Sequence, residues 1–312
     1  MAEMIATRIA YGEGLKVLAE TNKNVVVLDA DLSKSTKTAS FKDVCPERFF
    51  NVGIAEQNLI GVSAGLAASG KIPFASSFAM FAAGRAYEII RNSVAYPRLN
   101  VKIAATHAGL TVGEDGASHQ MVEDLSLMRT IPGMVVLNPA DAVEAKAAVL
   151  AAAEYQGPVY MRFGRMNVPV LFDESYKFEI GKGVLLAEGT DVTFVATGIM
   201  VAMALEAREI LAKDGISARV VNIHTIKPLD NNIIVESAEK TGAIVTAEEH
   251  SIFGGLGSAV SEVIVSEKPV PVELIGVRDT FGESGTPNDL LQKYGLTAEK
   301  MVEAAKKAIS KK

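Results

Sequence analysis

Three polar segments of the 312-residue chain carry the side chains that could do chemistry. Residues 29–35 hold two aspartates and two serines, residues 51–58 read NVGIAEQN, and residues 106–120 read THAGLTVGEDGASHQ. In the last segment, His107 and His119 bracket a glycine-rich loop that also supplies Asp115. Glycines let backbone approach a ligand closely, and these side chains supply hydrogen-bond donors and an acceptor. The loop therefore indicates a site for a polyol or a phosphate.

Each of these residues also has an ordinary structural explanation. A glutamate near a helix start, such as Glu56, usually complements the helix dipole. Asp31 and Ser35 are common turn and cap residues. A lone histidine is more often a hydrogen-bonded structural group, so the two histidines on one loop are the stronger indication of function.

The elements that must position these segments alternate along the first half of the chain. Apolar runs at residues 25–28, 101–105, 134–137 and 159–161 are separated by helical stretches. Such runs predict a parallel sheet covered on both faces, and ligands bind at the carboxyl ends of its strands. A helix of apolar and small residues opens near Ile54, and we expect it to be buried on all sides.

An aperiodic stretch at residues 168–183 interrupts this alternation. A second series of apolar runs follows at residues 192–196, 218–221, 243–245 and 272–275, with a helix from about residue 201 to 212. We therefore predict an α/β protein of two domains, each a mainly parallel sheet covered by helices. The predicted boundaries are residues 1–168 for the first domain, 169–185 for the linker and 186–312 for the second domain.

Composition favours a soluble, cytoplasmic protein. Hydrophobic residues make up 49% and charged residues 22%, and the net charge of −6 is mixed along the chain, which argues against nucleic acid as a partner. We find no signal peptide and no apolar run of about 20 residues, so we expect no membrane association. The single cysteine, Cys45, excludes an internal disulfide framework and a CxxC metal site.

The order of the motifs resembles the transketolase family along essentially the whole chain. The resemblance rests on GIAEQN, SSFAMFAAGRAYEIIRNS and THAGLTVGEDGASHQ, followed by NPAD, YMRFGRMNVP, IKPLD and EEHSIFGGLGS. Each motif alone is weak, but the glutamate motif and the GEDG-x-x-HQ loop at this spacing are specific. The resemblance implies a pyrimidine-binding thiamine-diphosphate domain followed by a transketolase C-terminal domain.

Roles for the cofactor-binding residues follow from this resemblance. Glu56 matches the glutamate that bonds the pyrimidine ring of thiamine diphosphate and promotes its imino tautomer, and charge-assisted hydrogen bonds are strong enough for this. Phe78 and Phe81 match the pyrimidine pocket, with Phe81 stacked on the ring. Their alternative explanation is core packing at i, i+3 on a helix. Asp31 is implied to lie near the thiazolium ring.

The same resemblance places the sugar substrate. His119 and Asp115 match residues that contact the sugar hydroxyls, with His119 nearest the reacting carbons, so Glu56 and His119 are the implied catalytic residues. The reaction implied is transfer of a two-carbon ketol unit from a ketose phosphate to an aldose phosphate, as in the pentose phosphate pathway. Arginine suits phosphate because its planar fork donates two parallel hydrogen bonds. Four residues match the terminal-phosphate set: Arg8, Ser35, His107 and Arg165.

A partner subunit is implied because half of the cofactor site is missing. The family holds the diphosphate and Mg²⁺ with a GDG motif and a downstream Asn, and Mg²⁺ requires oxygen ligands. The nearest strings are GEDG, already assigned to the sugar loop, and residues 213–215, which lack the context. We expect thiamine diphosphate to be shared with a separate N-terminal, diphosphate-binding subunit that holds Mg²⁺ or Ca²⁺, in an α2β2 heterotetramer. A second departure is Gly84 followed by Arg85, where many transketolases have a tyrosine.

Several alternatives stay open. The β subunit of a 2-oxoacid or acetoin dehydrogenase has the same two domains but would not need the phosphate set. Deoxyxylulose-phosphate synthase carries the missing domain in one long chain. A non-catalytic scaffold of the same fold would be expected to lose Glu56 or the GEDG loop. In the second domain, residues 254–258 open a helix and could form an anion nest, but they lack the third glycine of a dinucleotide fingerprint.

Overall fold

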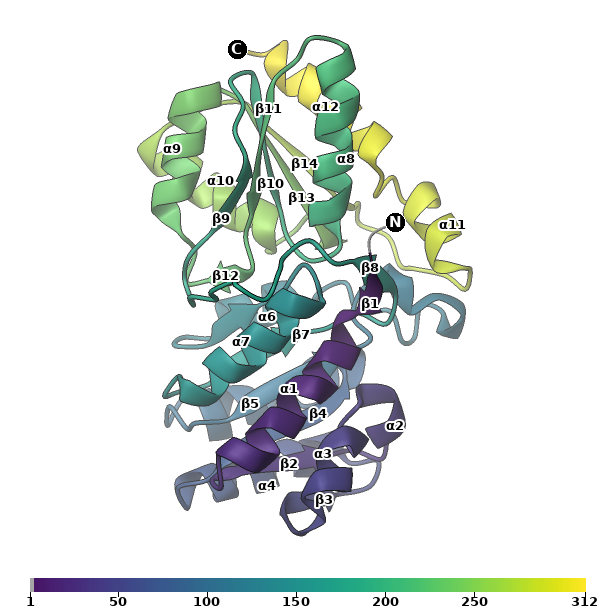
Figure 1. Ribbon diagram of the computed structural model, residues 1–312, viewed down its shortest axis with the longest axis vertical. Coiled ribbons are helices and arrows are strands. Elements are labelled where there is room, and N and C mark those ends of the chain that lie inside the picture. Colours follow the sequence, from purple (N-terminus) through teal and green to yellow (C-terminus); the bar gives the residue numbers. More distant parts are fainter. Residues whose placement is uncertain (1–2) are drawn as a thin grey trace.

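Two α/β units lie one above the other in the computed structural model, which describes residues 3–312 (Figure 1). The first contains a seven-stranded sheet of order β12-β6-β7-β5-β4-β2-β3, and the second a five-stranded sheet of order β14-β13-β10-β11-β9. Neighbouring strands are parallel except where β12 pairs with β6 and β9 pairs with β11. The predicted fold class, two mainly parallel sheets covered by helices, is confirmed.

The first sheet is sandwiched between two layers of helices. Helices α1, α3 and α7 pack over one face around Tyr11, Phe41 and Phe74, while α4 and α6 cover the other around Leu59 and Ile103. The strands are β2 (Val25–Asp29), β3 (Phe49–Asn51), β4 (Ile72–Phe78), β5 (Lys102–Thr106), β6 (Val135–Leu137), β7 (Val159–Arg162) and β12 (Thr225–Lys227). The helices are α1 (Thr7–Thr21), α2 (Ser33–Thr36), α3 (Ala39–Val44), α4 (Glu56–Ala68), α5 (Tyr87–Ile89), α6 (Asp124–Thr130) and α7 (Ala142–Glu154).

Short irregular elements complete the first unit. A two-stranded ribbon joins β1 (Met4–Ala6) to β8 (Asn167–Pro169) in antiparallel pairing. The 3₁₀ segments η1 (Pro46–Arg48) and η4 (Leu110–Asp115) lie between the strands, as do the π-helical segments η2 (Met80–Arg85) and η3 (Ile90–Ala95). Single π-helical turns occur frequently at functional sites.

The second unit repeats the layered arrangement on a smaller scale. Side-chain caps begin three of its helices: Asp230 accepts a hydrogen bond from the backbone N–H of Ile233, Thr286 from that of Asp289, and Thr297 from that of Lys300. Its strands are β9 (Val184–Ala187), β10 (Val192–Ala196), β11 (Ala218–Asn222), β13 (Ile244–Ser251) and β14 (Val272–Val277). Its helices are α8 (Met200–Lys213), α9 (Asn231–Thr241), α10 (Leu256–Glu267), α11 (Pro287–Lys293) and α12 (Ala298–Ile309).

Strand β12 joins the two units through their backbones. It lies within the predicted second domain, yet Thr225 and Lys227 pair antiparallel with Leu137 and Val136 at the edge of the first sheet. The side chain of Lys227 also donates to the carbonyl oxygens of Arg129 and Ile131 in the first unit, both at 2.7 Å. The boundaries at residues 1–168, 169–185 and 186–312 stay a prediction.

The expectation that the helix near Ile54 is buried on all sides is wrong. The buried face of α4 includes Leu59 and Ile60, but Gly61, Val62 and Gly65 are exposed. Within residues 3–312, a Cβ atom added at either of those glycines would meet no atom within 4 Å. After its first turn the helix is made of apolar and small residues on all sides, but residues 3–312 cover only one of its faces.

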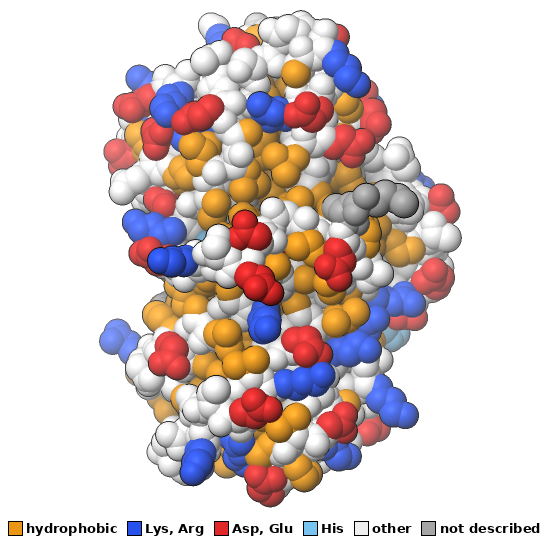
Figure 2. All heavy atoms as spheres, viewed as in Figure 1, with side chains coloured by type: hydrophobic (Ala, Val, Ile, Leu, Met, Phe, Trp, Pro, Cys, Tyr) orange, Lys and Arg blue, Asp and Glu red, His pale blue; other side chains and the backbone are white. Residues whose placement is uncertain are grey.

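The surface is mixed in character. Acidic and basic side chains are interspersed with apolar ones over the face shown in Figure 2. None of the helices within residues 3–312 combines the length and the apolar character that a membrane span requires.

Candidate active site

Four predicted site residues meet beyond the carboxyl ends of β4 and β5. Phe78 is the last residue of β4, and its ring stacks on that of His107, directly after β5, with 3.8 Å between ring centroids. Phe81 lies 6.1 Å from Phe78 and meets the edge of His119 at 5.3 Å. The alternative that both phenylalanines lie on one helix face is wrong, because Phe78 ends a strand and Phe81 belongs to η2.

Glu56, the first residue of α4, is a buried carboxylate with two donors. Its side chain is 1% exposed, Ser77 donates its hydroxyl to Oε1 at 3.1 Å, and Arg85 donates Nη1 to Oε2 at 2.7 Å. The helix N-terminus also favours the negative charge. Sequence reasoning assigned no role to Ser77 or Arg85. The available signals were that Ser77 precedes Phe78, and that Arg85 stands at a departure from the family pattern.

Three members of the predicted phosphate set lie together. The Nη1 group of Arg8 donates to the backbone carbonyl of Ser35 at 2.8 Å and lies 3.3 Å from Nε2 of His107. Ser35 therefore contributes a backbone oxygen to Arg8. The Nε group of Arg8 is buried and has no acceptor among residues 3–312. This arrangement leaves one guanidinium donor of Arg8 unsatisfied within the described chain.

The other predicted site residues, Arg165, Asp31 and Asp115, make no hydrogen bond with the rings of Phe78, Phe81, His107 and His119 among residues 3–312. Arg165 donates to Glu114 at 3.0 Å and to the carbonyl of Val112. Burial of Arg8 lowers its pKa, and the positive charge of Arg165 lowers it further. Asp31, with a positive φ of 68°, accepts a hydrogen bond from Asn51 at 2.9 Å. Asp115 ends η4 and is exposed. Within the described chain, no hydrogen bond connects Asp31 or Asp115 to the phenylalanine and histidine rings.

The second unit contacts the glycine-rich loop at residues 106–120. Glu249, on β13, accepts the backbone N–H of Thr111 at 2.6 Å. A Cβ atom at Gly109 would lie 2.3 Å from that carboxylate, so only glycine fits there. Gln120 donates to the carbonyl oxygens of Leu110 and Gly113 at 3.2 and 3.1 Å. Burial raises the pKa of Glu249. Neither the bond between Thr111 and Glu249 nor the bonds from Gln120 could be predicted from the sequence.

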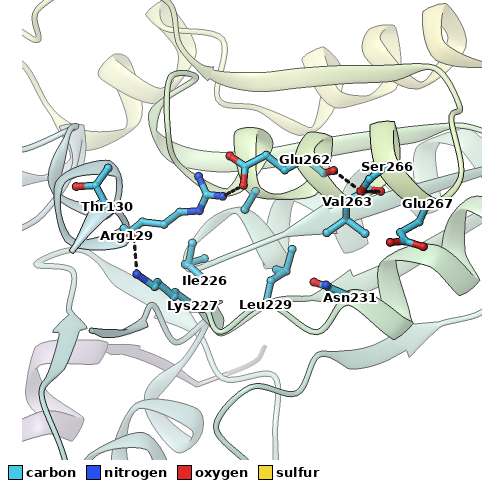
Figure 3. A pocket seen from close by; sticks show the side chains of 11 residues that line it. Arg129, Thr130, Ile226, Lys227, Leu229, Asn231, Glu262, Val263, Ser266 and Glu267 are labelled. Carbon is cyan, nitrogen blue, oxygen red and sulfur yellow. Dashed lines mark hydrogen bonds and ion pairs between the residues drawn. The ribbon is translucent and has the colours of Figure 1, made fainter. Parts of the chain in front are cut away.

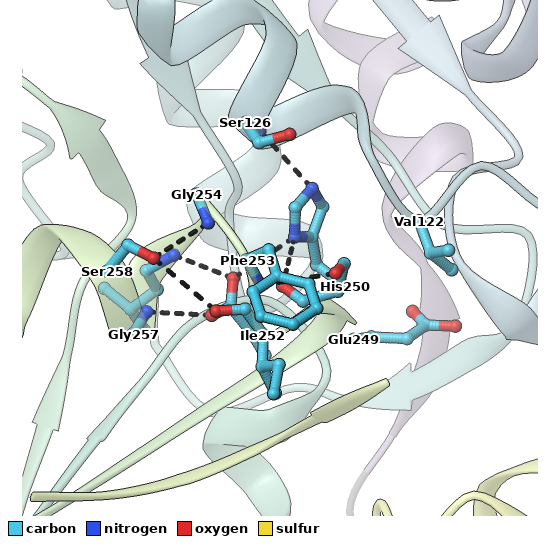
Figure 4. A network of polar contacts seen from close by, with 12 residues as sticks. Val122, Ser126, Glu249, His250, Ile252, Phe253, Gly254, Gly257 and Ser258 are labelled. Atoms are coloured by element: carbon cyan, nitrogen blue, oxygen red, sulfur yellow. Dashed lines mark hydrogen bonds and ion pairs between the residues drawn. The ribbon is translucent and has the colours of Figure 1, made fainter. Parts of the chain in front are cut away.

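The predicted anion nest at the start of α10 is filled by the chain itself. Glu248 accepts the backbone N–H groups of Leu256 and Gly257 at 2.7 and 2.8 Å. Figure 4 shows Gly257 and His250 within the same network of polar contacts. A Cβ atom at Gly255 would lie 2.0 Å from the same carboxylate. The glycines therefore serve a close internal contact rather than a nucleotide.

A cavity of about 530 Å³ lies between the two units, away from this cluster. Arg129 on α6 pairs with Glu262 on α10 across it, and Lys227 reaches the backbone of α6 from β12 (Figure 3). None of the predicted site residues lines it. Within residues 3–312, no three His, Cys, Asp or Glu side chains are grouped so that they could hold a metal ion.

We expect acid to destabilise the chain through His107. Burial, together with the charges of Arg8 and Arg165, lowers the pKa of His107 to about 3 from the usual value of about 6.5. Between these values the unfolded chain binds a proton that the folded chain does not. The free energy of unfolding should therefore fall as the pH drops below about 6.5, by up to about 1.4 kcal/mol per pH unit.

Thermal unfolding of the wild type and His107→Gln between pH 4 and 8 measures this effect. The variant should lose less stability on acidification. It should keep part of the slope, because burial also lowers the pKa of His224 to about 4. Identical slopes for the two chains would show that His107 is protonated as readily in the folded state as in the unfolded one.

Comparison with known proteins places both units in one family. Residues 3–170 match the description "Transketolase, pyrimidine binding domain", and residues 181–301 match "Transketolase, C-terminal domain". A Methanocaldococcus jannaschii protein, provisionally named a transketolase C-terminal section, is 56% identical over 295 residues, covering 94% of this chain and 92% of that protein. A subunit of a 6-deoxy-6-sulfo-D-fructose transketolase from a Clostridium species is 46% identical, covering 98% and 95%.

A longer relative and a solved structure are also transketolases. Mouse transketolase is 37% identical over 315 residues, and the chain spans 50% of its length. A solved structure described as a split-gene transketolase, an inactive β4 tetramer, is 61% identical, with a TM-score of 0.93 and coverage of 99% of both chains. The chain therefore belongs to the transketolase family, where it corresponds to the section made of the pyrimidine-binding and C-terminal domains.

Proposed function

We propose that this chain is the C-terminal subunit of a thiamine-diphosphate-dependent transketolase that transfers a two-carbon ketol unit between sugar phosphates. The carrying observation is Glu56, a buried carboxylate that the guanidinium of Arg85 links to the half-buried ring of Phe81. This pair fits an aminopyrimidine, because the carboxylate accepts a ring N–H while the phenyl face stacks. When bound, thiamine diphosphate supplies the carbanion chemistry, as cofactors of this kind do.

The protein's proposed contribution is to hold a proton on the cofactor and to orient the cofactor and the sugar. Ser77 donates to the Glu56 carboxylate at the first turn of α4, which orients it to hold a proton at the pyrimidine ring nitrogen. His119 stands edge-on to Phe81 and projects from the glycine-rich loop, which suits hydrogen bonds to sugar hydroxyls near the reacting carbons. Asp115 on the same loop and Asp31 beyond β2 are proposed to contact the sugar and the thiazolium side.

The cationic end of the site is proposed to bind the substrate's terminal phosphate. Arg8 has a buried Nε donor without an acceptor in the described chain, and His107 and the backbone of Ser35 hold its Nη1 group. Arg165 supplies a second guanidinium, close enough for its charge to lower the pKa values of Arg8 and His107. A dianionic phosphate matches two guanidinium groups better than a neutral sugar end does.

Replacing Arg165 by alanine should raise KM for phosphorylated sugars with a smaller effect on kcat. The phosphate does not react, so the lost binding is mostly the same in the ground and transition states. Arg165 already pairs with exposed Glu114, and exposed pairs contribute little, so the phosphate should displace that contact. A lost charge-assisted hydrogen bond lowers kcat/KM by roughly tenfold to hundredfold.

Steady-state kinetics on one phosphorylated sugar and on erythrulose or hydroxypyruvate test this prediction. The unphosphorylated substrates should be nearly indifferent to the change. Arg208→Ala, an exposed arginine of the second unit paired with Glu209, is the matched control. Equal losses on both kinds of substrate would mark Arg165 as structural and favour a 2-oxoacid dehydrogenase subunit.

A separate N-terminal subunit is proposed to supply the diphosphate site with its Mg²⁺ or Ca²⁺, in an α2β2 assembly. The α4 face described above is exposed, and Ile54, two residues before the helix, is 78% exposed, so residues 3–312 leave apolar surface near Glu56 uncovered. Exposed apolar patches of this kind mark association surfaces. A buried site would form when a partner covers this face.

Mixing this chain with a candidate N-terminal section and assaying ketol transfer tests the proposed function. Relatives are named for sulfofructose and for apulose 4-phosphate, so the assay should include a panel of ketose donors besides the pentose phosphates. Ketol transfer by the mixture supports the proposal. A mixed complex that forms but transfers no ketol unit from any donor would favour the scaffold alternative.

A further inference from the structure

We propose that Arg85 occupies the place of the cofactor's aminopyrimidine ring in the uncomplexed chain and must leave it when the cofactor binds. This inference rests on the proposed thiamine-diphosphate site. It concerns a residue to which neither the sequence pattern nor the similarity assigned a function. The result is a cofactor site that the chain closes with its own side chain.

The first observation is that Arg85 makes both contacts that the pyrimidine ring would need. Its Nη1 group donates to Oε2 of Glu56 at 2.7 Å. Its guanidinium carbon lies 4.8 Å from the centroid of the Phe81 ring, within the range of a cation–π contact. Guanidinium and aminopyrimidine are both planar groups that bear N–H donors. One carboxylate oxygen and one phenyl face therefore attract either group, but they cannot hold both in the same position.

The second observation is the difference in burial between the two partners. The Glu56 side chain is 1% exposed, whereas that of Arg85 is 49% exposed. A buried carboxylate that loses its cation incurs a large desolvation penalty. Ser77 holds only Oε1, so without Arg85 or a ligand the second oxygen would have no donor within residues 3–312. Arg85 therefore stabilises the empty site, and its solvent-facing half gives it a path outward.

The local backbone leaves Arg85 room to move. It is the last residue of the π-helical segment η2, directly after Gly84. A Cβ atom at Gly84 would meet only the end of the Met80 side chain, at 3.9 Å, among residues 3–312. The space beside Gly84 is thus open, and the Arg85 side chain, 49% exposed, has solvent on the side toward which its guanidinium can turn away from Phe81.

Two consequences have opposite signs, and together they distinguish this role from a purely structural one. Removing Arg85 should destabilise the empty chain, because Glu56 loses its cation. The same change should tighten pyrimidine binding by about tenfold, because a charge-assisted hydrogen bond no longer has to be broken first. If Arg85 merely maintained the fold of the site, its removal would lower both the stability of the empty chain and its affinity for the pyrimidine.

The experiment compares the full-length chain with Arg85→Ala and with the control Arg91→Ala. Arg91 lies nearby on η3, is exposed, and donates to its neighbour Asn92. The probe is 4-amino-5-hydroxymethyl-2-methylpyrimidine, which needs no diphosphate site, and its affinity is measured by NMR titration. Thermal unfolding without ligand gives the second readout. We expect R85A alone to show both a lower Tm and tighter binding of the probe.

A double-mutant comparison assigns the effect to the pair. In a Glu56→Ala background, Arg85→Ala should no longer lower Tm, because the charge that it compensates is gone. The inference is overturned if R85A binds the probe equally or more weakly than the wild type, or if the loss of Tm persists in the E56A background. If neither wild type nor R85A binds the probe, the proposed cofactor site fails as well, so the two failures are distinguishable.

Discussion

Replacing Glu56 by glutamine should lower kcat/KM for ketol transfer by on the order of a thousandfold in the complex with the N-terminal subunit, which corresponds to about 4 kcal/mol of barrier. Glutamine keeps the shape of the side chain and can still accept a hydrogen bond from Ser77. It cannot hold a proton at the pyrimidine nitrogen as a carboxylate can, and it has no charge with which to retain one. The loss should therefore appear in kcat rather than in KM for the sugar.

Folding must be shown to survive this change. Glu20→Gln, an exposed position on α1, serves as the matched control, and circular dichroism with thermal unfolding follows both variants. The E56Q chain should remain folded, because Arg85 is half exposed and can be solvated by water when its partner loses charge. An E56Q complex that keeps most of its turnover would show that Glu56 is only a helix-start residue.

The second large effect is the absence of activity without a partner. The purified chain should show no measurable ketol transfer and should bind thiamine diphosphate with Mg²⁺ only weakly. A diphosphate bound through Mg²⁺ needs a set of oxygen ligands, and residues 3–312 bring together no acidic cluster of that kind. Within residues 3–312 the proposed site offers the pyrimidine half of the contacts, and Arg85, which contacts Glu56 and Phe81, is proposed to compete for it.

Calorimetry of the chain alone and of the mixture with the N-terminal section measures this difference. The mixture should bind the cofactor at least a hundredfold more tightly, a difference of about 2.7 kcal/mol. A control mixture with an unrelated soluble protein excludes a general effect of added protein. Micromolar affinity for thiamine diphosphate in the chain alone would contradict the shared site.

The fold could be predicted from the sequence wherever strands are buried on both faces. The runs at residues 25–28 and 159–161 are apolar throughout, and both form central strands of the parallel sheet. Strand β4 was missed because Pro73, Ser76 and Ser77 break its apolar pattern. It is nevertheless buried, since Ser76 bonds Tyr11 at 2.6 Å and Ser77 bonds Glu56. In a sequence, polar residues that are hydrogen-bonded inside the protein cannot be told apart from polar residues of a loop.

The site was predictable in its residue types but not in its internal partners. The structure brings the rings of Phe78, Phe81, His107 and His119 together, while the roles that the motifs imply for them and for Glu56 stay a prediction. The contact between Glu56 and Arg85 spans 29 residues, and that between Thr111 and Glu249 spans 138. Such contacts depend on the assembled fold, and no local pattern records them.

Strand β12 affects the order in which this protein can be built. The edge of the first sheet at β6 is completed only by Thr225 and Lys227, which follow more than 50 residues after the last other strand of that sheet. During synthesis from the N-terminus, the unpaired edge of β6 is exposed while most of the second unit is still missing. Exposed strand edges invite pairing with other chains, so the nascent first domain passes through an interval in which it is prone to aggregate. A chain divided at the predicted linker would keep that unpaired strand edge permanently.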